Sequence, residues 1–234
     1  MSPIYFAIGD IHGEADKLRA LHAAILDRIA FEKSPAVIVH LGDYVDRGVD
    51  SKGVIEQILA LEAMFEGSTK IRVVSLLGNH EDMMLDALVS EDSARWTDGH
   101  GFATVVSYFG SPDRTGKDWR NSVPKEHIAW MRALPTMWRE GPYVFVHAGI
   151  DPPTFPEDDE GVHIWTRSIH FTETERWPKR KELEGITVIH GHMARDEPEI
   201  VPQRINVDTS ACYGGPLTAV VLKEGAEPSF LMAR

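Results

Sequence analysis

Cysteine is almost absent from this sequence, and long apolar runs are missing. The chain of 234 residues has one cysteine, Cys212, so no disulfide bond can form within it. That composition is typical of proteins from a reducing compartment. No run approaches the roughly 18 apolar residues of a membrane-spanning helix, and the N-terminus lacks the basic and apolar segments of a secretory signal. We therefore expect a cytoplasmic protein with no membrane partner.

Positive charge is also scarce. Lysine and arginine number 24 against 36 acidic residues, which gives a formal net charge of −12. A protein that binds long nucleic acid needs a basic surface, so the composition argues against that class. The overall field would also repel a substrate that carries phosphate, unless bound cations reverse the sign locally. The sequence gives no indication of the oligomeric state.

The apolar pattern of the first third predicts alternating strands and helices. Buried strands are expected at residues 4–9, 36–41 and 71–77. Helices are expected at 14–31, at 51–66 and from His80 onwards. This β-α-β-α-β order is typical of a largely parallel sheet with right-handed crossovers. The chain shows no linker, repeat or low-complexity tract, so we expect a single α/β domain over residues 1–234.

The remaining two thirds give a less regular pattern. Residues 92–140 contain most of the tryptophans and several turn signals, and we predict a mostly helical segment that covers one rim of a site. We expect the tryptophans to serve in packing rather than in base stacking. Further strands are predicted at 143–146, 186–189, 204–207, 217–222 and near 229–232.

Three short motifs follow the first three predicted strands. They are Gly9-Asp10-Ile11-His12-Gly13, Gly42-Asp43-Tyr44-Val45-Asp46-Arg47-Gly48 and Gly78-Asn79-His80-Glu81. Their spacing is close to one strand–helix–strand unit of roughly 30 residues, so the motifs should meet at one edge of one sheet. Carboxylate, imidazole and amide groups gathered there are the ligands that divalent metal ions use.

These motifs, in order, resemble the signature of the calcineurin-like metallophosphoesterases, and specifically the small bacterial type of the phosphoprotein phosphatase (serine/threonine) branch. Three later motifs match in the same order: Val146-His147-Ala148-Gly149, Trp165-Thr166-Arg167 and Gly191-His192. The resemblance runs from Gly9 to about Gly215. It implies a two-sheet β-sandwich flanked by helices, a four-layer α/β/β/α arrangement with the metals at the strand ends.

The resemblance implies two divalent metal ions, with manganese favoured and iron or zinc as alternatives. The ligands that it implies are Asp10, His12, Asp43, Asn79, His147 and His192. Asp43 can bridge both ions through its two oxygens. His190 lies two residues before His192 and could point the same way, so it stays open as the alternative last ligand.

We expect the remaining polar residues of the motifs to bind phosphate or to transfer protons. Two ions roughly 3.5–4 Å apart would hold a bridging hydroxide for in-line attack on phosphate. Arg47, Asn79 and Arg167 would bind the phosphate oxygens, the arginines through charge-assisted hydrogen bonds. His80 would protonate the leaving oxygen as general acid, and Asp46 would orient it. Arg47 and Arg167 count among the predicted catalytic residues together with His80 and Asp46.

The function expected first is a metal-dependent phosphomonoesterase, a serine/threonine protein phosphatase acting on phosphoproteins or phosphorylated small molecules. The alternative is a diadenosine tetraphosphatase, a dinucleoside polyphosphate hydrolase, which shares every motif. A third hypothesis is a catalytically silent scaffold that binds a phosphorylated partner.

A few positions lie outside this scheme. Ser210 follows Asp208-Thr209 where the family commonly has glycine, and Tyr213 could reach the phosphate pocket. His22 and His40 fit buried or bystander positions, and Glu81 reads as an acid favoured by the helix dipole in a first turn.

Overall fold

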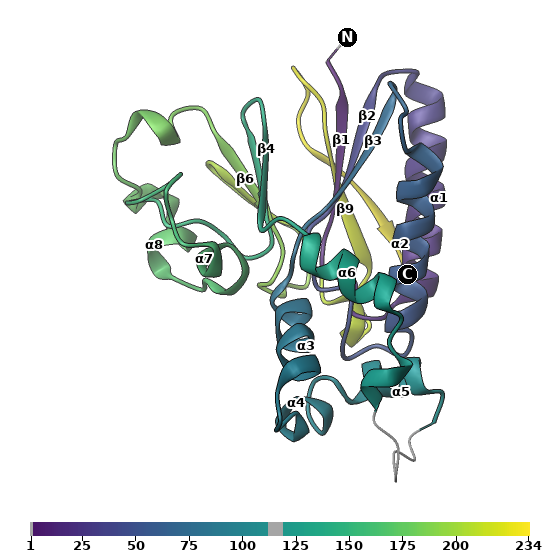
Figure 1. Cartoon of the computed structure of the whole chain (residues 1–234). Coiled ribbons are helices and arrows are strands. Elements are labelled where there is room, and N and C mark those ends of the chain that lie inside the picture. Colours follow the sequence, from purple (N-terminus) through teal and green to yellow (C-terminus); the bar gives the residue numbers. More distant parts are fainter. Residues whose placement is uncertain (1, 112–118) are drawn as a thin grey trace.

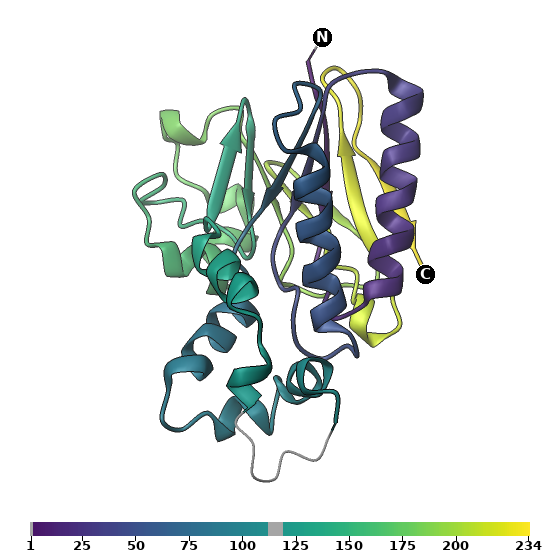
Figure 2. The same cartoon turned by 45° about the vertical axis from the view of Figure 1, so that its right-hand side comes forward.

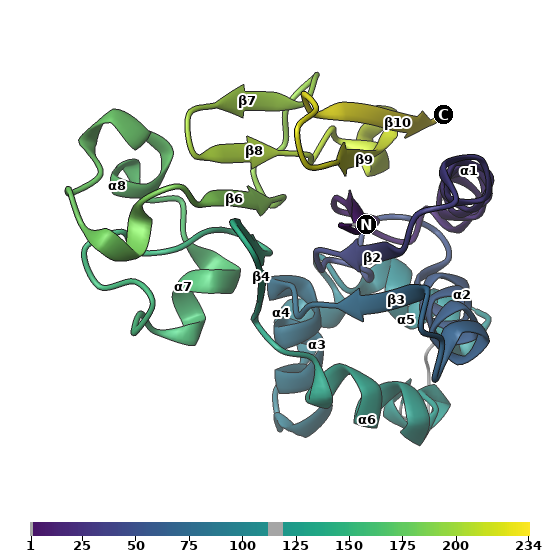
Figure 3. The same cartoon turned by 90° about the horizontal axis from the view of Figure 1, so that it is seen from above.

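Two five-stranded sheets face one another and are flanked by helices in the computed structural model, which describes residues 2–111 and 119–234 (Figure 1). The strand order is β10-β9-β1-β2-β3 in one sheet and β4-β5-β6-β8-β7 in the other. Seen from above, the strands of the two sheets lie beside one another, with helices outside both (Figure 3). This is the sandwich that the sequence resemblance implies.

The first sheet combines the N-terminal strands with the C-terminal ones. Strands β1, β2 and β3 are parallel, whereas β9 is antiparallel to both β1 and β10. Helices α1 (Ala15–Glu32) and α2 (Ser51–Phe65) cover its outer face (Figure 2). The strands are β1 (Ile4–Ile8), β2 (Ala36–His40), β3 (Ile71–Ser75), β9 (Leu217–Leu222) and β10 (Ser229–Ala233).

The second sheet has three parallel strands, β5, β6 and β8, and an antiparallel strand at each edge. Its strands are β4 (Met137–Glu140), β5 (Tyr143–Val146), β6 (Thr187–His190), β7 (Glu199–Val201) and β8 (Arg204–Asn206). The sequence pattern did not predict the two edge strands. β4 falls inside the segment expected to be mostly helical, and both strands are too short to show an alternating pattern.

The remaining helices form two groups. Helices α7 (Glu160–Trp165) and α8 (Ile169–Thr172) lie beside the second sheet, and the others lie around the lower end of the first (Figure 1). The latter are α3 (Asn79–Val89), α4 (Ala94–Thr97), α5 (Phe102–Phe109) and α6 (Lys125–Ala133). Residues 112–118, which belong to the predicted covering segment at 92–140, lie outside the described residues. Among the residues described, no helix combines the length and apolarity needed to cross a membrane.

Strand alternation explains how the sheets are buried on both faces. In β1, Ile4, Phe6 and Ile8 pack towards the helices, whereas Tyr5 and Ala7 pack between the sheets. Successive side chains of a strand point to opposite faces, so each inner strand contributes to two cores. Phe145 of β5 joins the core between the sheets, and its neighbours Val144 and Val146 join a third core under α7 and α8.

Candidate metal centre

Each of the six parallel strands in the described part of the chain is followed by a polar side chain that lies at the same place. In parallel sheets, ligand sites form beyond the carboxyl ends of the strands. The residues that follow the strands here are Asp10 and His12 (β1), Asp43 (β2), Asn79 (β3), His147 (β5), His192 (β6) and Asp208 (β8). All of them are buried. The structure therefore brings the six predicted metal ligands together, with Asp208 as an additional carboxylate.

Asn79, His147 and His192 form a tight triangle beside Asp43. Nε2 of His147 lies 3.0 Å from Oδ1 of Asn79 and 3.1 Å from Nδ1 of His192. Nδ1 of His192 lies 3.0 Å from Oδ1 of Asn79. Oδ1 of Asp43 lies 3.4 Å from Nε2 of His147. These four side chains offer ligand atoms close enough to share one metal ion.

His12 approaches the other oxygen of Asp43. Its Nε2 lies 3.3 Å from Oδ2 of Asp43 and has no hydrogen-bond partner among the described residues. His80 lies on the same side, with Nε2 3.9 Å from that oxygen. Asp43 therefore stands between two groups of donors, as a bridging carboxylate would.

Hydrogen bonds to Nδ1 of His147 and His12 determine that the lone pair of each ring is on Nε2. Nδ1 of His147 lies 3.1 Å from the carbonyl oxygen of Leu41, and Nδ1 of His12 lies 2.7 Å from that of Val45. A carbonyl only accepts, so both Nδ1 atoms donate, and both Nε2 atoms present lone pairs to Asp43. Lone pairs facing a carboxylate repel one another unless a cation lies between them. The donor set thus fits a metal ion.

The backbone around these donors is held in an uncommon conformation. His12, Asp43 and His192 have φ values of 45°, 54° and 65°, in the left-handed region that non-glycine residues rarely adopt. Such conformations cluster at functional sites, where the surroundings over-determine them. Glu81 is one such restraint, because its carboxylate accepts hydrogen bonds from the backbone N–H groups of Asp43, Tyr44, Val45 and Gly78. Its role is therefore larger than that of a helix-dipole acid.

Two motif glycines leave room for the carboxylates. A Cβ atom at Gly191 would collide with Oδ1 of Asp10, and one at Gly78 would collide with the backbone nitrogen and Oδ1 of Asp43. The backbone N–H of His192 can consequently donate to both oxygens of Asp10, at 3.0 and 3.2 Å. The glycines of these motifs are needed for close approach as well as for turning.

Burial shifts the pKa values of the acids and histidines in this site towards their neutral forms. Burial, together with the carboxylates of Asp208 and Asp43, raises the pKa of Asp10 well above its ordinary value. Burial and Glu81 raise the pKa of Asp43 in the same way. Burial keeps His12 and His147 neutral by lowering their pKa values well below the ordinary range. Neutral imidazoles beside carboxylates that resist ionisation suit bound cations.

His80 and Asp46 form a hydrogen-bonded pair next to these donors. Nδ1 of His80 lies 2.6 Å from Oδ2 of Asp46. Trp96 and Thr104, from the segment predicted to cover the rim, also donate to the Asp46 carboxylate, at 3.1 and 2.8 Å. Burial and Arg47 lower the pKa of His80 to about 3. Nε2 of His80 is therefore free to accept from Nη2 of Arg47, 3.2 Å away.

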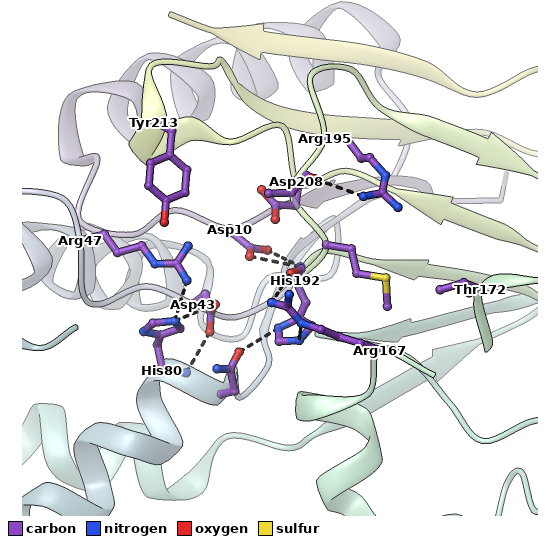
Figure 4. A pocket seen from close by; sticks show the side chains of 13 residues that line it. Asp10, Asp43, Arg47, His80, Arg167, Thr172, His192, Arg195, Asp208 and Tyr213 are labelled. Atoms are coloured by element: carbon purple, nitrogen blue, oxygen red, sulfur yellow. Dashed lines mark hydrogen bonds and ion pairs between the residues drawn. The ribbon is translucent and has the colours of Figure 1, made fainter. Parts of the chain in front are cut away.

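A pocket of about 460 Å³ opens over the donors (Figure 4). Arg47 and Arg167 line it, and Nε of Arg167 donates to Nε2 of His192 at 3.0 Å. Tyr213, which the sequence left as an open candidate, also lines the pocket, and its ring centre lies 5.5 Å from Cζ of Arg47. The pocket thus combines buried acids at its floor with guanidinium groups on its walls.

His190 points away from this arrangement. Its Nε2 lies 3.0 Å from Nη1 of Arg204, and its Nδ1 lies 2.9 Å from the carbonyl oxygen of Gly191. Both ring nitrogens of His190 are thus engaged away from Asn79 and Asp43. The geometry therefore favours His192 over His190 as the last candidate ligand.

Sequence reasoning missed two charged residues of the pocket, Asp208 and Arg195. Asp208 could have been found, because it follows a predicted strand as Asp10 and Asp43 do. Arg195 carried no such signal, since it stands three residues beyond His192 in an irregular stretch.

Comparison with known proteins identifies the class. The family described as calcineurin-like phosphoesterase matches residues 5–219, so this chain belongs to that family. A bis(5'-nucleosyl)-tetraphosphatase PrpE (asymmetrical) of Bacillus cereus is 26% identical over 92% of this chain and 89% of its own length. A symmetrical bis(5'-nucleosyl)-tetraphosphatase of Aromatoleum aromaticum is 32% identical over 63% of this chain. The chain spans only 44% of the length of that second relative.

Solved structures support the fold. A putative diadenosine tetraphosphatase matches with a TM-score of 0.63 and 23% identity, over 100% of this chain and 95% of its own. A cold-active protein-tyrosine phosphatase of a psychrophilic Shewanella species matches with a TM-score of 0.65 and 15% identity, over 100% of this chain and 81% of its own. At these identities the likeness concerns architecture alone.

Proposed function

We propose that this protein is a metal-dependent hydrolase of dinucleoside polyphosphates. The observation that carries the proposal is the convergence of Asn79, His147 and His192 on Asp43 beneath a pocket walled by arginines. The substrate class is supported by the relatives named bis(5'-nucleosyl)-tetraphosphatases. This order reverses the sequence-based expectation, which placed a serine/threonine protein phosphatase first and the tetraphosphatase second.

We assign two divalent cations to these donors. Asp10, His12 and Asp43 would hold one ion, and Asp43, Asn79, His147 and His192 would hold the other. Mn²⁺ is our first choice, with iron and zinc as alternatives, because all three accept mixed oxygen and imidazole ligands. Such a pair of ions polarises a phosphoryl oxygen and lowers the pKa of water towards neutrality.

Arg47, Arg167 and Asn79 would hold the attacked phosphoryl group. Arg47 lies against His80, and Arg167 lies against His192, so the two guanidinium groups border the pocket next to the donors (Figure 4). Guanidinium groups bind phosphoryl oxygens through charge-assisted and often bidentate hydrogen bonds. Their charges would also stabilise the additional negative charge of the transition state.

His80 would donate the proton that the leaving oxygen needs. In the free protein Arg47 helps to lower the pKa of His80, and a bound phosphoryl group would offset that positive charge. Asp46 would orient the ring through Nδ1 and stabilise its protonated form. Replacing His80 by Gln should lower kcat by about 10²- to 10⁴-fold, with a smaller change in KM.

Comparing substrates with good and poor leaving groups makes the test of His80 specific. 4-Nitrophenolate leaves without protonation, so the loss in His80→Gln should be much smaller for 4-nitrophenyl phosphate than for a substrate with a poor leaving group. Equal losses on both substrates would refute the role of His80 as general acid.

The substrate class is tested by direct competition between the hypotheses. The Mn²⁺-loaded protein would be assayed with diadenosine tetraphosphate, by chromatography of the products, and with a phosphoserine peptide, by phosphate release. We expect turnover of the dinucleotide at a kcat/KM at least about 100-fold above that of the peptide, a difference of about 2.7 kcal/mol. The reverse ranking would restore the protein phosphatase hypothesis. Binding of either ligand without turnover would favour the scaffold.

A further inference from the structure

The pocket contains one arginine more than the attacked phosphoryl group uses. Arg47 and Arg167 are assigned to that group, which leaves Arg195 on the pocket wall without a role. Figure 4 shows Arg47 and His80 on one side of the pocket, and Arg195 on the other side beside Asp208. The extra guanidinium group is therefore placed away from the histidine that would protonate the leaving oxygen.

The backbone of Arg195 is held at both of its polar groups. Its N–H donates to the carbonyl oxygen of Asp208 at 3.1 Å, and its carbonyl oxygen accepts from Oγ of Ser210 at 3.0 Å. Ser210 has a φ of 60°, in the left-handed region where glycine is favoured. The hydroxyl that ties down Arg195 gives a reason for serine at this strained position.

The side chain of Arg195, by contrast, is only weakly engaged. Its Nε lies 3.8 Å from Oε1 of Glu199, its Nη1 donates to the carbonyl oxygen of Ala194 at a long 3.4 Å, and about half of the side chain (49%) is exposed. The other oxygen of Glu199 lies 2.5 Å from Nη2 of the buried Arg204. Glu199 is thus committed mainly to Arg204, and the guanidinium group of Arg195 can turn to a ligand in the pocket.

We propose that Arg195, positioned by Ser210, binds a second phosphate of the substrate. This inference rests on the proposed function. Water adds to the attacked phosphorus and releases a proton to solvent, the bond to the leaving arm breaks, and His80 protonates the leaving oxygen on its side of the pocket and then regains a proton from solvent. The arm that stays attached to the attacked phosphorus then extends away from His80. Arg195 contacts the next phosphate of that retained arm, which a phosphomonoester does not possess.

The test compares substrates with and without the retained arm. Arg195→Gln removes the charge and keeps much of the side chain. We expect kcat/KM for diadenosine tetraphosphate to fall at least about 10-fold more than kcat/KM for 4-nitrophenyl phosphate, mainly through KM, because one charge-assisted hydrogen bond to phosphate is lost. Arg195→Lys should recover part of the loss, since it restores the charge without the forked geometry.

Two controls make the comparison specific. Arg176→Gln removes an arginine that is similarly exposed and paired with a glutamate, but does not line the pocket. It should leave the ratio of the two kcat/KM values unchanged. Bis(4-nitrophenyl) phosphate has a retained arm without a second phosphate, and Arg195→Gln should affect it no more than the monoester.

Ser210 provides an independent second variant. Ser210→Gly removes the hydroxyl and the backbone strain together, whereas Ser210→Ala removes the hydroxyl alone. Both should reduce the preference for diadenosine tetraphosphate by several-fold through KM, although Ser210→Gly should keep or raise the thermal midpoint. If Ser210 had only a structural role, the preference for diadenosine tetraphosphate would fall in the less stable variant and be kept in the more stable one.

The outcomes separate this inference from the proposed function. Equal losses on all three substrates in Arg195→Gln, or no loss on any, would overturn the inference and leave the proposed function intact. If the wild type turns over the monoester and not the dinucleotide, the proposed function fails and the inference fails with it.

Discussion

Two pairs of buried histidines in this molecule have almost the same local geometry. Nε2 of His147 lies 3.1 Å from Nδ1 of His192, and Nε2 of His22 lies 2.9 Å from Nε2 of His40. Burial lowers the pKa of every one of the four rings. The distance between two imidazoles therefore does not distinguish a metal site from a structural contact.

The surroundings of the two pairs differ. His147 and His192 face Asn79 and Asp43 beneath an open pocket, and the proton of His147 is committed to a carbonyl group. His22 and His40 lie between α1 and the first sheet, where they hydrogen-bond to one another, and His40 reaches Oγ of Ser75 at 3.3 Å. In that pair one ring can donate and the other accept, so a cation is not needed. A metal site requires converging lone pairs together with carboxylate charge.

Substituting Asp43 should distinguish the two histidine pairs most clearly. Asp43→Asn removes the negative charge between the two donor groups, and we expect kcat/KM to fall at least about 1,000-fold, about 4 kcal/mol. The measurement is steady-state hydrolysis with bound Mn²⁺ determined by elemental analysis. Retained activity with a full metal content would refute the site. The thermal midpoint of Asp43→Asn without metal should stay close to that of the metal-free wild type, because the contact between His22 and His40 is unchanged.

A matched substitution in each pair tests the comparison directly. His147→Gln should weaken Mn²⁺ binding about 100-fold, about 2.7 kcal/mol, because one ligand is lost. His40→Gln should leave Mn²⁺ affinity unchanged and lower the free energy of unfolding instead. Titration calorimetry and urea unfolding provide the two measurements. Weaker Mn²⁺ binding in His40→Gln would mean that our distinction between the pairs is wrong.

Adding metal should stabilise the folded protein through the candidate metal centre and not through the His22–His40 pair. Mn²⁺ at 100 times its dissociation constant should raise the free energy of unfolding by about 2.7 kcal/mol, because the ion binds the folded state. Calorimetric scans with Mn²⁺ and with a chelator would measure this effect, and His40→Gln should show an increase of the same size. An unchanged thermal midpoint in the wild type would contradict the proposed metal centre.

Acid should act on the His22–His40 pair gradually, over a range of pH. Burial lowers the pKa of His22 to about 4, below its ordinary value of 6.5. The unfolded chain therefore takes up this proton first. The free energy of unfolding should fall as pH drops from 6.5 towards 4, by about 1.4 kcal/mol per pH unit from this residue. His22→Gln should remove that contribution, and identical pH slopes in both proteins would refute it.

Much of the fold was predictable because its strands carry strong local patterns. The strands beginning at Ile4, Ala36 and Ile71, and the helices that follow the first two, lie within a residue or two of their predicted bounds. The edge strands β4 and β7 were missed because they are held by their neighbours rather than by their own three or four residues. Register and edge pairing are tertiary properties.

The candidate site was predictable where its residues stand in motifs at strand ends. Asp10, Asp43 and Asn79 follow consecutive parallel strands, and the sheet brings them together. The role of Glu81 in holding the backbone of Asp43, Tyr44 and Val45 could not be predicted, because those contacts join residues far apart in the chain. The same applies to Trp96 and Thr104, which reach Asp46 from the predicted covering segment.

The sequence alone determined the kinds of candidate ligand, their order along the chain and their positions after strands, because these depend on local residue patterns. Only the tertiary structure decided that His192 rather than His190 faces Asn79. It also placed Arg195 opposite His80, and it made His22 and His40 a closed pair. These outcomes depend on which way a side chain points after its backbone has been fixed by distant strands, and no local pattern encodes that direction.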